Sequence, residues 1–135
     1  GGSNNIASGN YTFVGGGGGD DSNYGNEAFS HYSAILGGRL NTAGDNSDPN
    51  NGKYATVSGG DYNTASGIFS SVSGGTGNTA SGSGSSVSGG GENWAFGEWA
   101  SVYRTWLAKQ AEYRNEIQRR QADAPSLAGL IHVSP

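Results

Sequence analysis

Two short stretches of this 135-residue chain concentrate the side chains that could bind a metal ion or a partner. They are GGDDSNYG (18–25) and GDNSDPNN (44–51), both rich in carboxylates and amides. Such oxygen-rich loops can hold Ca²⁺, but the spacing at 45–52 does not fit an EF-hand loop, which favours a solvated loop without metal. Because irregular loops often carry recognition, we predict that these stretches contact a partner. The predicted contacts are Asp20, Asp21, Tyr24, Asp45 and Asp48.

The sequence offers little support for a catalytic motif. GTGNTA (75–80) matches a dinucleotide-binding motif by letters, but that motif needs a strand before it and a helix after it. No G-x-S-x-G is present, and His31 and His132 have no partners in a triad-like arrangement. The chain has no cysteine, which excludes disulfides and thiolate metal sites. We therefore expect no enzymatic activity and no cofactor.

Charge is divided unevenly along the chain. Residues 1–103 hold two basic and eight acidic side chains, a formal charge of −6, and residues 104–135 hold five basic and three acidic ones, a charge of +2. The basic part is too weakly charged to predict nucleic-acid binding. Ends of opposite sign favour end-to-end stacking of subunits instead. No apolar run approaches the length of a membrane span.

An internal repeat organises residues 1–103. Glycine pairs open six units, which are 1–15, 16–36, 37–58, 59–73, 74–88 and 89–103. Each unit places an asparagine, an alanine two residues later and then a β-branched residue in one frame. The asparagines are Asn5, Asn26, Asn41, Asn63, Asn78 and Asn93. The two stretches 18–25 and 44–51 are insertions into this frame, and a register kept across insertions is typical of a repeat fold.

Each unit reads as one coil of a solenoid with two short strands. The glycine pair makes one corner, and the asparagine, in αL or bonded to its own backbone, is expected to make the second. In IFSSVS (68–73) Ser70 and Val72 should point inward, with Phe69 outward. Burying one valine is worth about 1.5–3 kcal/mol, whereas ordering the backbone costs about 1–2 kcal/mol per residue. A single narrow coil is thus poorly supported and needs a neighbouring chain.

A second column of the repeat is aromatic. It lies opposite the valine column and contains Tyr11, Tyr32, Tyr54, Phe69, Gly84 and Trp99. We expect these rings to pack as a stacked seam or an outer ladder, with a ligand-binding stripe as the alternative.

The pattern N-x-A-S-G-x-[FY]-S-S-V-S-G-G, found at 63–75 and in degenerate form in all six units, resembles the YadA-like head repeat of trimeric autotransporter adhesins. The resemblance covers residues 1–103. It implies an all-β, left-handed parallel β-roll of about six 15-residue coils, assembled as a homotrimer on the bacterial outer surface. It also implies binding to a host matrix protein or a surface glycan. Similar rolls occur in phage tail fibres, so a virion fibre is an alternative, and a self-assembling extracellular filament is a third.

The chain changes character after the repeat. Aromatic residues in GGGENWAFGEWASVYRTW (89–106) are expected to cap the open end of the solenoid. Residues 107–125 are free of glycine and end at Pro125, which predicts a helix. Trp106, Gln110, Tyr113 and Ile117 follow the spacing of a short coiled-coil seam, although the helix could instead fold against the end of the roll. We predict that 104–135 is a capping and assembly element with contacts from Trp99, Trp106, Tyr113 and Ile117.

Overall fold

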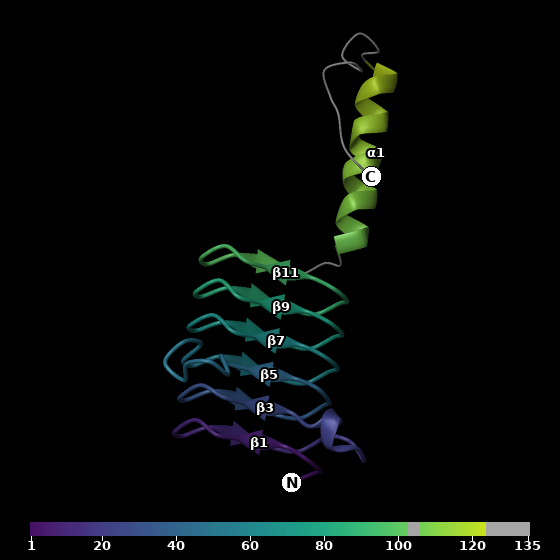
Figure 1. Ribbon diagram of the computed structural model, residues 1–135. Coiled ribbons are helices and arrows are strands. Elements are labelled where there is room, and N and C mark those ends of the chain that lie inside the picture. Colours follow the sequence, from purple (N-terminus) through teal and green to yellow (C-terminus); the bar gives the residue numbers. More distant parts are fainter. Residues whose placement is uncertain (103–105, 124–135) are drawn as a thin grey trace.

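The computed structural model describes residues 1–102 and 106–123, and side chains within the helix only for 112–120. Twelve two-residue strands and one long helix follow each other along these residues (Figure 1). The strands are β1 (Ile6–Ala7), β2 (Phe13–Val14), β3 (Glu27–Ala28), β4 (Ala34–Ile35), β5 (Thr42–Ala43), β6 (Thr56–Val57), β7 (Thr64–Ala65), β8 (Ser71–Val72), β9 (Thr79–Ala80), β10 (Ser86–Val87), β11 (Trp94–Ala95) and β12 (Ser101–Val102). A short 3₁₀ helix, η1, spans Ser22–Tyr24, and the helix α1 spans Trp106–Asp123.

The strands form two parallel six-stranded sheets. One has the order β1-β3-β5-β7-β9-β11, and the other β12-β10-β8-β6-β4-β2. Each unit therefore contributes one strand to each sheet, and the coils stack from the N-terminal end upward (Figure 1). Thr42 pairs with Thr64 across an insertion, and Thr64 pairs with Thr79 without one. The predicted solenoid of six two-stranded coils, its register and its C-terminal helix are confirmed.

The core is a narrow column of small side chains. Ser70 and Val72 are buried, whereas 57% of Phe69 is exposed, which confirms the predicted inward and outward faces. The largest fully buried apolar side chains are Ile35, Val57, Val72 and Val87. Alanine fills the opposite column, and no large aromatic ring enters the described core. Apolar burial per coil is accordingly small.

The repeated asparagines form a hydrogen-bonded ladder inside the roll. In the fourth coil, Asn63 Nδ2 donates to the carbonyl oxygens of Gly59 at 3.0 Å and Gly75 at 2.9 Å. It also donates to Oδ1 of Asn41 in the coil below. The αL alternative for these asparagines is wrong, because in five of the six units positive φ is found at the preceding residue, such as Tyr62 at 59°. The other alternative holds, because the Asn63 amide bonds the backbone of its own coil at Gly59. The asparagine thus lies at the same corner as the glycine pair and links coils through its amide.

The glycine pair makes its corner as expected. Gly75, the second of its pair, has φ +89°. A Cβ there would lie 2.0 Å from the carbonyl oxygen of Gly90 in the next coil, so the corner requires glycine for both conformation and space.

The aromatic column makes the other corner. Its residues take positive φ, from 58° at Phe69 to 63° at Tyr54, although bulky side chains rarely adopt that conformation. From the second coil onward, the backbone N–H of this column donates to the coil below, as when Phe69 donates to the carbonyl oxygen of Lys53 at 2.9 Å. The rings of Tyr11, Tyr32, Tyr54 and Phe69 stack with centroids 4.9–5.1 Å apart. The predicted outer ladder is therefore present.

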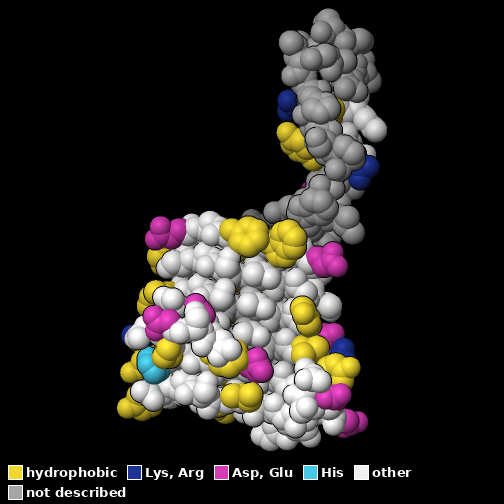
Figure 2. Space-filling view, viewed as in Figure 1, with side chains coloured by type: hydrophobic (Ala, Val, Ile, Leu, Met, Phe, Trp, Pro, Cys, Tyr) yellow, Lys and Arg dark blue, Asp and Glu magenta, His cyan; other side chains and the backbone are white. Residues whose placement is uncertain are grey.

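Three aromatic rings of the last coil are described, and Tyr103 lies outside the described residues. Trp94, Phe96 and Trp99 are 56%, 64% and 71% exposed and lie on the sides of the coil, with an apolar patch visible over β11 (Figure 2). The expected cap is wrong for these three side chains, because alternation in the strand turns Ala95 inward and Trp94 outward. Trp99 instead lies against Gly84, where a Cβ would come within 2.3 Å of its indole.

Candidate partner-binding surface

The two insertions project from opposite corners of the coils (Figure 1). Residues 18–25 lie between β2 and β3, at the corner of the glycine pairs. Residues 44–51 lie between β5 and β6, at the corner of the aromatic ladder. The five predicted contact residues are consequently divided between two separate surfaces and do not form one site.

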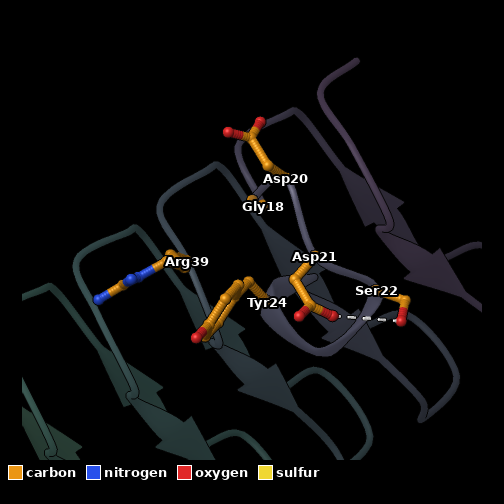
Figure 3. Close-up of a pocket in the computed structure, with 7 residues that line it drawn as sticks. Gly18, Asp20, Asp21, Ser22, Tyr24 and Arg39 are labelled. Carbon is orange, nitrogen blue, oxygen red and sulfur yellow. Dashed lines mark hydrogen bonds between the residues drawn. The ribbon is translucent and has the colours of Figure 1, made fainter.

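The first insertion surrounds an open pocket of about 770 Å³. Its lining consists of Gly18, Gly19, Asp20, Asp21, Ser22, Tyr24 and Arg39. Asp21 caps η1, because its Oδ1 accepts hydrogen bonds from the backbone N–H and the Nδ2 of Asn23, both at 3.1 Å. Asp20, by contrast, has no hydrogen-bond partner among the described residues. Figure 3 shows the two carboxylates pointing in different directions.

Arg39 joins this pocket to the next coil. Its guanidinium lies over the Tyr24 ring, 5.3 Å from the centroid, and forms two hydrogen bonds of 2.9 Å with the Asp61 carboxylate. These hydrogen bonds lower the pKa of Asp61 and raise that of Arg39. Sequence analysis missed Arg39 as a site residue. The signal was available, because Arg39 and Asp61 are each the residue after a glycine pair and so occupy one column.

The second insertion is held by its own side chains. Asp45 Oδ1 accepts hydrogen bonds from the Ser47 hydroxyl at 2.6 Å and the Ser47 backbone N–H at 2.8 Å, which lower the pKa of Asp45. Asp48 Oδ1 accepts from the backbone N–H of Asn50 at 2.8 Å. At the base, the buried hydroxyl of Ser30 donates to the Asn51 carbonyl and accepts from the Asp45 N–H. Both predicted contact carboxylates in this loop therefore close turns.

The predicted assembly residues are only partly described. Trp99 is exposed on the last coil, and Tyr113 is 57% exposed on α1, where Ile117 is half-buried. The side chains of Trp106 and Gln110 lie outside the described residues, as do 104–105 and 124–135. On the described face of α1, Glu116 pairs with Arg119 and with Arg120.

No family model, curated protein or solved structure matches this chain. The described residues contain no group of three or more acidic or histidine side chains that could hold a metal ion. The described helix α1 is not apolar enough to span a membrane.

Proposed function

We propose that this chain is the head of an extracellular fibre of the trimeric adhesin type, in which three left-handed rolls lie side by side. The head is displayed on a bacterial outer surface and binds a host matrix protein or a surface glycan, without catalysis. The observation that supports this proposal best is the stack of six coils in unbroken register, from which the insertions 18–25 and 44–51 project. A stack of this kind is a stiff support that carries variable loops away from its attachment.

The distribution of apolar side chains supports association of several rolls. The interior holds little more than valine, isoleucine, alanine and small polar residues. Larger apolar side chains lie outside, including Ile6, Phe13 and Leu36 at 45%, 55% and 57% exposure. Burying such side chains between chains supplies the stability that a narrow core lacks.

A binding role, not a catalytic one, is supported by how the polar groups are used. Most of the described acidic and basic side chains that make specific contacts close turns or link coils. His31 also has a structural contact, because its Nδ1 accepts a hydrogen bond of 2.9 Å from the backbone N–H of Asn10. The uncommitted polar groups of the pocket at 18–25 are therefore the best candidates for partner contacts.

Sedimentation equilibrium and binding to immobilised matrix proteins and glycans test this proposal. We expect a folded species of three 13.7 kDa chains that binds at least one immobilised partner. A variant with 18–25 replaced by two residues, Asp-Tyr as at 61–62 of the fourth unit, serves as the control for the insertion. A folded monomer at micromolar concentration contradicts the trimer, and a folded trimer that binds no partner contradicts the adhesive role.

A further inference from the structure

The pocket at 18–25 carries negative charge that the described structure does not neutralise. Asp21 uses its Oδ1 to cap η1, and its Oδ2 has no partner among the described residues. Asp20 contributes a second carboxylate without such a partner. The one cation of the lining, Arg39, is already paired with Asp61. The pocket thus presents two uncompensated carboxylates to a ligand.

The aromatic ring of the pocket already holds a cation on one side. The Arg39 guanidinium lies 5.3 Å from the Tyr24 centroid, whereas Asp21 lies on the other side of this residue in Figure 3. Tyr24 remains 40% exposed. Gly19 leaves room for this side chain, because a Cβ on Gly19 would lie 2.6 Å from the Tyr24 Cβ and 3.3 Å from its Cγ. A ligand can therefore reach the ring beside the carboxylates.

We propose that this pocket binds a cationic group, the ammonium or guanidinium of a basic side chain on a partner protein. The group lies beside the Tyr24 ring and pairs with the carboxylate of Asp21, and the Asp20 carboxylate adds negative charge to the pocket. An aromatic ring attracts a cation through its quadrupole, and a carboxylate nearby adds a charge-assisted hydrogen bond. An anionic ligand would be repelled, and a neutral sugar would leave both charges uncompensated. This inference rests on the proposed partner contact at 18–25 and specifies its chemistry.

Titration of the full chain tests the proposal, with heteronuclear NMR as the readout. The probes are a tetra-arginine peptide, spermine as a free polyamine and maltotriose as a neutral sugar. We expect the peptide to shift the amide resonances of Gly19 and Ser22 in a saturable manner. Maltotriose should not shift these resonances. Spermine binding as tightly as the peptide would assign the site to free polyamines and contradict the protein partner.

Paired charge variants separate this pocket from the general acidity of the roll. The variant Asp20→Asn/Asp21→Asn keeps the cap of η1, because asparagine caps as well as aspartate. We expect it to weaken peptide binding about tenfold, and Tyr24→Leu to weaken it about threefold. Asp45→Asn/Asp48→Asn makes the same charge change at the other insertion and should alter the affinity less than about twofold.

Equal weakening by both double variants would show nonspecific attraction and overturn the site. Saturable binding of maltotriose at Gly19 with no effect of the peptide would overturn its cationic specificity but leave the proposed adhesive function intact. Failure of the adhesive function has a different signature, because a folded trimer would then bind the peptide but no immobilised partner.

Discussion

Asn63 Oδ1 accepts two hydrogen bonds from Asn78, one of 3.0 Å from its backbone N–H and one of 3.1 Å from its Nδ2. The same relation joins each asparagine of the ladder to the next coil. Both residues are fully buried, so the amide groups replace the water that would otherwise solvate the corner. The ladder ends at Asn93, whose buried Oδ1 has no partner among the described residues.

This difference along the ladder predicts unequal costs for the same substitution. Asn63→Ala leaves buried groups of two neighbouring coils unpaired and should lower the free energy of unfolding by about 3 kcal/mol or more. Asn93→Ala removes fewer bonds and should cost about half as much. Urea unfolding at one fixed protein concentration measures both, since association shifts apparent stability. Equal losses would contradict the ladder as the source of stability.

The positive φ of the aromatic corner predicts an unusual order of substitutions. Phe69→Ala loses the ring stacked on Tyr54 and keeps an L-residue in the left-handed region. Phe69→Gly loses the same ring but relieves that strain, as Gly84 does in the next coil with φ +66°. The glycine variant should therefore be more stable than the alanine variant by about 1 kcal/mol. Thermal unfolding measures the difference, and a more stable alanine variant would refute the argument.

Periodicity was sufficient to predict the coils, the strands and the inward columns, because the frame repeats at Asn63, Asn78 and Asn93 with constant spacing. It was insufficient for the aromatic corner, because bulky residues seldom take positive φ. Only Gly84, in the same column, indicated that conformation. The pocket was missed in part for another reason. Arg39 and Asp61 are 22 residues apart, and their shared position after a glycine pair shows that they pair only once the coils are known to stack in that register.

The Arg39–Asp61 pair predicts a pH dependence. The pKa of Asp61 is lowered below its ordinary value of 3.8, so its contribution is present above that value and is lost as the pH falls through the lowered pKa. Asp61→Asn should thus reduce stability slightly and equally from pH 5 to 8, and the difference should vanish in acid. The effect is small because both side chains are exposed at the surface. Melting curves of the parent chain and the variant, recorded between pH 5 and 8 and in acid, with and without salt, measure this difference in stability. A difference that grows in acid would contradict the ion pair.

The second insertion should be dispensable for folding. Gly52 already occupies the position of Gly67, since Ala55 donates to Gly52 O at 3.1 Å as Ser70 donates to Gly67 O at 3.0 Å. Replacing 44–51 by one serine, as in the fourth unit, should keep the circular dichroism spectrum and the oligomeric state. A moderate loss of stability is expected, because the buried Ser30 hydroxyl loses its partners in the loop. Loss of the folded state would make this loop structural.

Buried serines of the roll interior provide the last prediction. The hydroxyls of Ser70 and Ser85 have no hydrogen-bond partner among the described residues, and Ala55 and Ala100 occupy the same column in other coils. Ser85→Ala should therefore leave stability unchanged or raise it by up to about 1 kcal/mol, because an unpaired buried hydroxyl is removed. Ser30→Ala is the matched control and should destabilise, since its hydroxyl joins Asp45 and Asn51.

Denaturant unfolding of both serine variants measures the contrast, and a high-resolution crystal structure explains a failure. If Ser85→Ala destabilises as much as Ser30→Ala, the Ser85 hydroxyl has a partner in solution. A water molecule between Ser70 and Ser85 would be the physical cause, because buried water pairs polar groups that the protein leaves unpaired. The roll interior would then be hydrated along this column, and the alanines at 55 and 100 would interrupt that hydration.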